Sequence, residues 1–201
     1  MLIAGNTFDY PFIHGKAIQA AGGYSFVSCS DEAVENGFVR LADYPITDLI
    51  FGADRRPFSH TLQQLLTTYC QGGGNLMLSG SYIGSNMNSP TALNFTENIL
   101  KYSFGGSMIN STSGEIYGAN TRFSIPRTIN EQTYAVPAPD RLPPIAPAYS
   151  AFVYNPGSYS AGIAYKGKYR TFVLGFPFES IQGVKERARV MSAILGFFGS
   201  K

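Results

Sequence analysis

The sequence predicts a three-layer α/β sandwich, in which helices cover both faces of a mainly parallel sheet. Short apolar runs alternate with helical stretches along the first part of the chain, which is the pattern of βαβ units. The same pattern, apolar strands followed by an amphipathic helix, recurs at the end of the chain. The 201 residues, 44% of them hydrophobic, suffice for one domain with a buried core.

The elements of the first half follow from caps, breakers and periodicity. Ser30 is the expected N-cap of one short helix, and Gly37 follows the end of that helix. Pro57 fits the first turn of the clearest helix, whose leucines recur at helical spacing. The predicted strands are 2–5, 24–28, 48–52 and 75–79, and the predicted helices are 14–22, 31–37 and 57–71.

The second half is interrupted by a segment rich in Gly, Ser, Asn and Pro. The stretch VPAPDRLPPIAP at 136–147 holds five of the twelve prolines. Because proline fits neither a helix interior nor a central strand, we predict an insertion of short strands and loops over 105–150. Lys166-Gly167-Lys168 suits a hairpin. The predicted strands are 123–125, 150–154, 161–165 and 170–175, and the last helix covers 182–198.

Charge and cysteine usage exclude several classes of protein. The net charge is only +2, so an excess of cations for a nucleic-acid backbone is lacking. No apolar run approaches the ~20 residues of a membrane span. Cys29 and Cys70 form no CxxC pair, and we expect two unlinked thiols at opposite ends of the sheet. Neither a metal site nor a cofactor is therefore predicted.

The chain begins inside an apolar segment, MLIAGNTF, with no signal peptide before it. We therefore expect residues 1–201 to form one domain taken from a longer chain.

Polar residues gather where the predicted parallel strands end. In open α/β sheets, ligands bind outside the carboxyl ends of the strands. This edge should include Asn6, Asp9, His14, Arg55, Arg56, His60, Ser79, Ser81, Tyr82 and Glu179.

The turn LSGSYIGS after the fourth strand has the setting of a nucleophile elbow. A sharp turn there exposes a hydroxyl or thiol, and neighbouring backbone N–H groups hold an oxyanion. Ser81 would need His14 or His60 as a base within hydrogen-bond reach. In the stretch 80–84, GSYIG, the serine lies one position earlier than in the GxSxG motif. A tight turn of small residues is therefore the simpler interpretation.

Other residues at this edge allow weaker hypotheses. Arg55 and Arg56 could bind an anionic group such as a uronate or phosphate, or form a solvated surface pair. Asp9 and Glu179 could form a carboxylate pair for glycoside chemistry, although nothing in the sequence fixes their separation. The many Tyr and Phe residues offer faces for sugar stacking or simply pack the core.

Four segments resemble the class I glutamine amidotransferase-like superfamily, whose fold is flavodoxin-like. They are AGNTFDYPFIHGKAI, YPITDLIFGADRR, GGGNLMLSGSYIGS and YRTFVLGFPFESI followed by KERARVMSAILGFF. More narrowly, the chain is similar to the version of this domain in secreted bacterial proteins labelled xanthan lyase. The resemblance implies a periplasmic, cell-surface or secreted location.

The chain departs from the active members of this superfamily at two positions. The resemblance implies a cysteine at the elbow, but Ser79, Gly80 and Ser81 stand there. It also implies a His-x-Glu arrangement after a late strand, where this chain has Pro177 in place of the histidine and retains Glu179. Proline cannot accept a proton, so glutamine hydrolysis by this mechanism is not expected.

Three functional hypotheses remain. The first is a non-catalytic binding or accessory domain of a larger, polysaccharide-related protein, with a carbohydrate or other small polar ligand and the flanking domains as partners. The second is a serine hydrolase that uses Ser81 with His14 or His60. The third is a purely structural domain, which would have no deep pocket at the strand ends.

Overall fold

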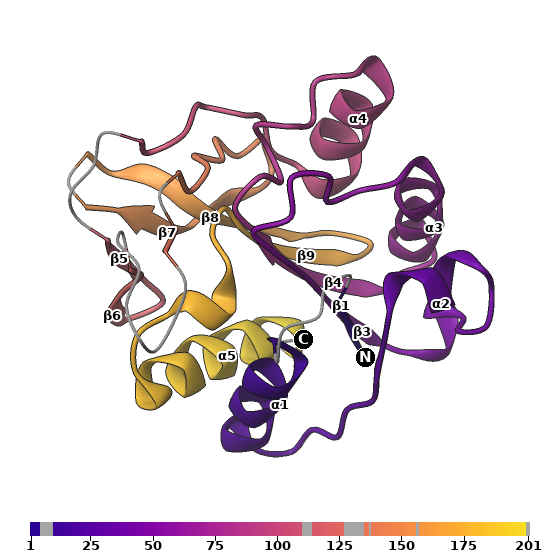
Figure 1. Ribbon diagram of the computed structural model, residues 1–201, viewed down its shortest axis with the longest axis horizontal. Helices are drawn as coiled ribbons and strands as arrows, with labels where there is room; N and C mark the ends of the chain where they lie inside the picture. Colours follow the sequence, from indigo (N-terminus) through magenta and orange to yellow (C-terminus); the bar gives the residue numbers. More distant parts are fainter. Residues whose placement is uncertain (5–9, 110–113, 127–134, 137, 156, 200–201) are drawn as a thin grey trace.

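One mixed sheet runs through the molecule (Figure 1). The computed structural model describes residues 1–4, 10–109, 114–126, 135–136, 138–155 and 157–199. Within these residues, nine strands lie in the order β2-β1-β3-β4-β9-β8-β7-β5-β6.

The parallel half of the sheet contains the strands that the alternating pattern predicts. Its members are β1 (Leu2–Ala4), β2 (Ser28–Cys29), β3 (Ile46–Gly52), β4 (Asn75–Gly80) and β9 (Arg170–Leu174), all paired in parallel. The carboxyl ends of these strands therefore meet at one edge, which is where the sequence analysis places a ligand.

The remaining strands are antiparallel, so the expectation of a mainly parallel sheet is wrong. They are β8 (Tyr159–Lys166), β7 (Tyr149–Tyr154), β5 (Glu115–Gly118) and β6 (Thr121–Ser124). Among the described strands, four pairings are parallel and four are antiparallel. Short connections, such as the predicted turn at 166–168 between β8 and β9, favour antiparallel neighbours.

The segment 105–150 is not set apart as a separate insertion. β5, β6 and the start of β7 extend the sheet beyond β8, so their backbone groups pair along its edge. The proline-rich part returns across the molecule and pairs with residues 103–108, for example through the bridge between Ser107 and Asp140. This return brings an acidic side chain to the end of β4.

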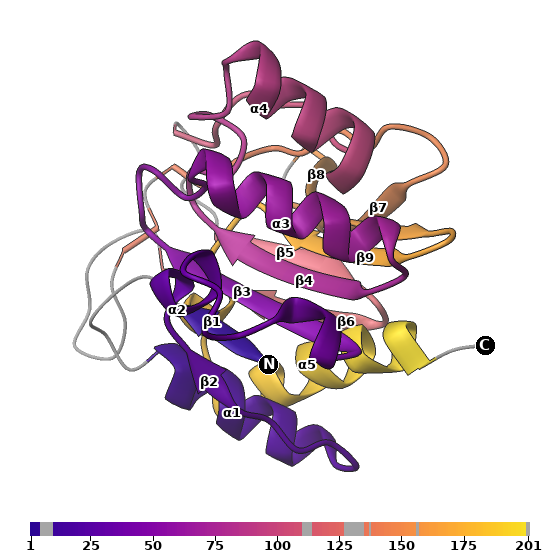
Figure 2. The same ribbon diagram turned by 90° about the vertical axis from the view of Figure 1, so that its right-hand side faces the viewer.

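Helices cover both faces of the sheet, as predicted (Figures 1 and 2). α1 (Tyr10–Ala21) and α5 (Val184–Gly199) pack side by side on one face. The other face carries α2 (Asp31–Glu35), α3 (His60–Gln71) and α4 (Pro90–Phe95), which a π-helical turn η2 (Thr96–Leu100) continues. Two short 3₁₀ turns are η1 (Leu41–Asp43) and η3 (Phe178–Ser180).

Several boundaries differ from the prediction for local reasons. The N-cap of α3 is Ser59, whose hydroxyl accepts from the Leu62 N–H, so Pro57 lies before the helix rather than in its first turn. α1 begins at Tyr10 instead of residue 14. Strand β2 has only two residues, although 24–28 was predicted. The helix at 90–100 was not predicted, although Ser89 caps it and Pro90 opens it.

The two faces bury separate apolar layers. Successive residues of β3 alternate between them: Ile50 packs on the α1 and α5 face, whereas Leu49 and Phe51 pack on the α3 face. Cys29 and Cys70 are free thiols, and burial raises the pKa of Cys70 to about 12. The half-buried Cys29 lies on β2, and the buried Cys70 lies on α3.

Candidate functional site

The loop after β4 is folded inward. The Ser81 N–H donates to the Gly52 carbonyl at 2.9 Å, so the first residue after β4 stays bonded to the end of β3. Ser79 is fully buried and Ser81 is 3% exposed. Neither hydroxyl has a hydrogen-bond partner, so neither contacts a histidine nitrogen. The turn exists as predicted, but it does not present a hydroxyl to solvent.

Asp140 holds the next part of this loop. Its Oδ2 accepts from the Gly84 N–H at 2.8 Å, the Ser85 N–H at 2.9 Å and the Ser85 hydroxyl at 3.2 Å. Its Oδ1 accepts from the Ser107 hydroxyl at 3.0 Å. Burial raises the pKa of this carboxyl, while the four donors oppose that shift.

This arrangement occupies the anion-binding groups of the loop. Two successive backbone N–H groups pointing at one oxygen are the geometry that binds an anion or an oxyanion. Here the chain's own Asp140 carboxylate accepts from the N–H groups of Gly84 and Ser85. Those two groups are therefore not available to a substrate.

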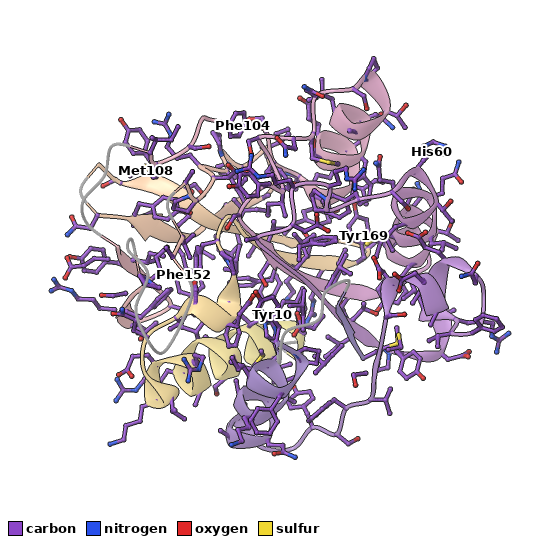
Figure 3. The ribbon with its side chains drawn as sticks, in the orientation of Figure 1. Tyr10, His60, Phe104, Met108, Phe152 and Tyr169 are labelled. Atoms are coloured by element: carbon purple, nitrogen blue, oxygen red, sulfur yellow. The ribbon has the colours of Figure 1, made fainter. Side chains whose placement is uncertain are left out.

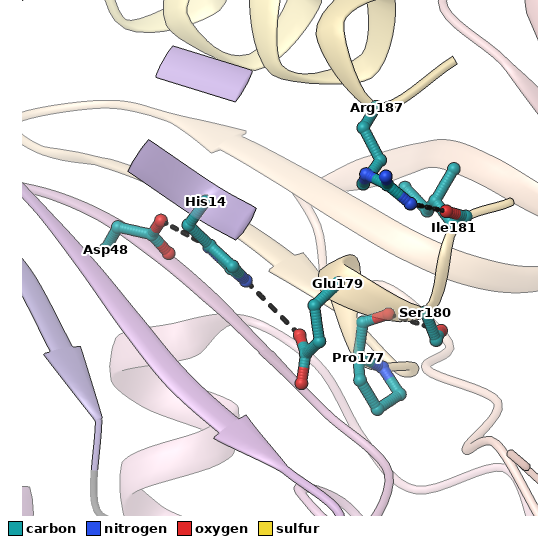
Figure 4. A network of polar contacts seen from close by, with 7 residues as sticks. All are labelled: His14, Asp48, Pro177, Glu179, Ser180, Ile181 and Arg187. Atoms are coloured by element: carbon teal, nitrogen blue, oxygen red, sulfur yellow. Dashed lines mark hydrogen bonds and ion pairs between the residues drawn. The ribbon is translucent and has the colours of Figure 1, made fainter. Parts of the chain in front are cut away.

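His14 lies in the interior between two carboxyl groups (Figure 4). Its Nδ1 is 2.7 Å from Asp48 Oδ2, and its Nε2 is 3.2 Å from Glu179 Oε2. The ring also packs edge-on against Phe178, with centroids 4.6 Å apart. α1, β3 and η3 thus contribute one buried side chain each to this row.

The charge state of His14 follows from these contacts. Burial by itself lowers the pKa of His14, but the charges and hydrogen bonds of Asp48 and Glu179 outweigh it and raise the pKa to about 9. At neutral pH the imidazolium donates through both nitrogens and has no lone pair to accept a proton. His14 is therefore not available as a general base in this arrangement.

His60 lies elsewhere. It opens α3 at the outer side of the molecule, far from Tyr10 in the view of Figure 3, and its Nε2 contacts Gln64 Nε2 at 2.9 Å. It belongs to neither the His14 row nor the Ser81 loop.

Glu179 and Pro177 lie at the end of β9, as predicted. Pro177 precedes the η3 turn, and its carbonyl accepts from the Ser180 hydroxyl at 2.6 Å. Glu179 is 1% exposed and contacts a histidine from α1, not one from its own segment. The retained glutamate thus orients a histidine after all, but a different histidine from the one that the resemblance implies.

Gly52 leaves the space in which this row packs. Its φ is +57°, and an added Cβ would lie 2.6 Å from the Tyr10 ring and 3.2 Å from Glu179 Oε1. We expect Gly52→Ala to destabilise the fold by about 2–3 kcal/mol, because it combines left-handed strain with overlap.

Gly22→Ala is the matched control for this prediction. Gly22 has a φ of +76° with open space around its Cβ position. The substitution should therefore cost only about 1–2 kcal/mol from backbone strain. Urea unfolding of both variants tests the prediction, and equal losses would contradict the role of packing at Gly52.

The exposed candidates form a different group. The Arg55 guanidinium lies 5.0 Å from the centre of the Tyr82 ring, and the Arg55 carbonyl accepts from Asn86 Nδ2 at 2.6 Å. Arg56 is exposed, and its N–H donates to Asp54 Oδ1 at 2.8 Å. Asn6 and Asp9 lie outside the described residues, so the pairing of Asp9 with Glu179 stays a prediction.

A second arginine–aromatic pair continues this edge. The Arg141 guanidinium lies 4.6 Å from the centre of the Tyr159 ring. Phe104 belongs to the same region, since its ring borders Gly84 and its segment pairs with the one containing Arg141. Phe104 and Tyr159 are 43% and 47% exposed. We call Arg55, Tyr82, Phe104, Arg141 and Tyr159 the aromatic strip; Figure 3 labels Phe104.

Two buried carboxylates at these sites, Asp48 and Asp140, were not predicted from the sequence. Asp48 stands inside the apolar strand ITDLIFG, where an acidic residue indicates a buried partner. Asp140 lies in the proline-rich stretch 136–147, which has no periodic pattern. Its position beside the loop after β4 depends on tertiary contacts, such as the one with Gly84. Within the described residues, no cluster of three or more His, Cys, Asp or Glu side chains could hold a metal ion. Among those residues, no helix has the length and hydropathy to cross a membrane.

Comparisons with known proteins identify the fold. No protein-family model matches the chain, and no curated protein sequence matches it. The N-terminal domain of mmIFT52 superposes with a TM-score of 0.64 at 14% identity, covering 100% of this chain and 97% of that one. A ThuA-like protein from Bacteroides uniformis ATCC 8492 gives 0.58 at 12% identity, with 100% and 91% coverage. Another from Parabacteroides merdae ATCC 43184 gives 0.56 at 10%, with 100% and 89%.

The chain therefore has a class I glutamine amidotransferase-like α/β fold, as its ThuA-like neighbours do. This part of the predicted resemblance is confirmed. Identities this low establish the fold alone, and no reaction or ligand follows from them. The narrower similarity to proteins labelled xanthan lyase stays a prediction.

Proposed function

We propose that this domain is a non-catalytic binding module of a larger, polysaccharide-related protein outside the cytoplasm. Its ligand is an acidic carbohydrate, bound along the aromatic strip at the carboxyl ends of the strands. Sugar rings stack on exposed aromatic faces, and arginine pairs with carboxylates.

The observation that carries this proposal is the contrast between the two parts of this edge. The elbow groups are internal: Ser79 and Ser81 are buried, and Asp140 already accepts from the loop N–H groups. The aromatic strip is instead partly exposed and includes two arginine–aromatic pairs. A ligand thus meets recognition groups but no nucleophile.

The serine hydrolase is the less favoured alternative for a specific reason. A general base needs a free lone pair near the hydroxyl. Both nitrogens of His14 contact carboxyl groups, and His60 contacts Gln64. A purely structural domain is the other alternative, and it predicts no ligand at the strip.

Binding to immobilised polysaccharides tests the proposal. Polygalacturonate is the acidic probe and dextran the neutral one. We expect the protein to be retained by polygalacturonate and not by dextran, and Arg55→Ala or Tyr82→Ala to weaken retention about fivefold. Arg40→Ala is the matched control, because Arg40 is exposed but pairs with Asp43 on η1.

Two activity assays separate the alternatives. Ammonia release from glutamine and hydrolysis of p-nitrophenyl esters should stay at background. Ester hydrolysis that disappears in Ser81→Ala would overturn the proposal in favour of the hydrolase. Failure to bind either polysaccharide, without any activity, would overturn it in favour of the structural domain.

A further inference from the structure

A second candidate site lies at the opposite end of the sheet from the aromatic strip. A groove of about 470 Å³ opens at the amino ends of the parallel strands, beside α1 and α5. Figure 2 shows these two helices on one face of the sheet, near the start of the chain. Its wall is mainly apolar and includes Ile18, Phe26, Met77, Met191, Leu195 and Phe198. This size and lining are those of small-molecule sites.

One charged side chain interrupts the apolar wall. Asp48 lines the groove, and its side chain is only 6% exposed. Its Oδ2 is bound by His14, whereas its Oδ1 has no hydrogen-bond partner. A buried carboxylate oxygen without a donor is costly and rare in native proteins. Such an atom beside a groove points to a donor supplied by a ligand.

The surroundings of Asp48 favour a positively charged donor. His14 supplies one cation, but it lies between two carboxyl groups, those of Asp48 and Glu179. The α-amino group of Met1 also interacts electrostatically with Asp48, yet its hydrogen bond goes to the Ile46 carbonyl at 2.8 Å. An ammonium group can donate a charge-assisted hydrogen bond to Asp48 Oδ1, whereas a carboxylate has no hydrogen to donate to this oxygen.

We propose that this groove binds a small molecule with an apolar body and one protonated amine. The apolar body lies against the α1 and α5 side chains, and the ammonium donates to Asp48 Oδ1. This site does not depend on the proposed function, because it uses none of the residues of the aromatic strip.

Three matched probes test the proposal: 4-phenylbutylamine, 4-phenylbutan-1-ol and 4-phenylbutanoate. They share one apolar body and differ in the terminal group. We expect calorimetry at pH 7 to show the amine binding at least about tenfold more tightly than the alcohol, since its hydrogen bond is charge-assisted. The carboxylate should bind most weakly. Equal binding of amine and alcohol, or binding of none of the three, would overturn the proposal.

Two variants locate the binding. Ile18→Trp fills the groove and should abolish amine binding, whereas Val184→Trp changes an exposed position of α5 and should leave it unchanged. Asp48→Asn should remove the preference for amine over alcohol. If Asp48→Asn does not fold, the probe ranking and the Ile18→Trp result still decide. Amine binding that survives in a folded Ile18→Trp protein would place the ligand elsewhere.

Discussion

His14→Phe is expected to destabilise the protein by about 3–5 kcal/mol at pH 7. The substitution keeps a ring in the space beside Phe178 but removes both donors. Asp48 and Glu179 then remain buried without their shared cation. Urea unfolding measures the loss. His60→Gln is the control, because His60 is exposed, and it should change the unfolding free energy by no more than about 0.5 kcal/mol.

The same row makes stability depend on pH. The carboxyl groups of Asp48 and Glu179 raise the pKa of His14 to about 9 in the folded protein, against about 6.5 for an unperturbed histidine. A pKa raised on folding means that the folded state binds the proton more tightly. The contribution is therefore fully present below about pH 6.5 and is lost as the pH rises through about 9, by on the order of 3 kcal/mol.

The pH profile can be checked against the variant. The difference in unfolding free energy between wild type and His14→Phe should shrink from pH 6 to pH 10. A difference that stays constant over this range would show that His14 does not hold a proton in the fold.

Asp140→Ala is the second variant with a large expected effect, a loss of about 3 kcal/mol or more. It leaves the N–H groups of Gly84 and Ser85 without their acceptor in a buried loop. Asp140→Asn should cost less, because an amide oxygen can still accept from both N–H groups while its NH₂ donates to the Ser107 hydroxyl.

Hydrogen exchange gives a local measure of this prediction. The amides of Gly84 and Ser85 should exchange faster in Asp140→Ala, and less so in Asp140→Asn. Asp43→Ala is the control, since Asp43 forms only an exposed ion pair with Arg40 and should cost at most about 1 kcal/mol. An Asp140→Ala protein as stable as this control would contradict the role of the carboxylate as the anchor of the loop.

Local chemistry in the sequence determines much of the parallel half. Ser30 caps α2 as predicted, because its hydroxyl accepts from the Ala33 N–H within the same turn. The apolar segments 48–52, 75–79 and 170–175 are strands, as their patterns predict. Elements of this kind depend on neighbours a few residues away, so one sequence suffices to predict them.

The antiparallel half of the sheet was harder to predict from the sequence. β5 (Glu115–Gly118) is a short, glycine-containing strand that pairs on one side with the neighbouring β6 and joins the common sheet only through β7, more than 30 residues later. Propensity in strands mostly reflects such partners. For the same reason, the segment 105–150 reads as an insertion although its strands belong to the common sheet.

The sequence by itself determined the α/β class and the position of the loop after β4, and it has Ser79–Ser81 and Pro177 where the resemblance implies a cysteine and a histidine. Only the tertiary structure decided what the polar residues do. His14 meets Glu179 across 165 positions, and Asp140 meets Gly84 across 56. Such contacts leave no periodic trace in the sequence, because the topology of the sheet rather than local spacing brings these side chains together.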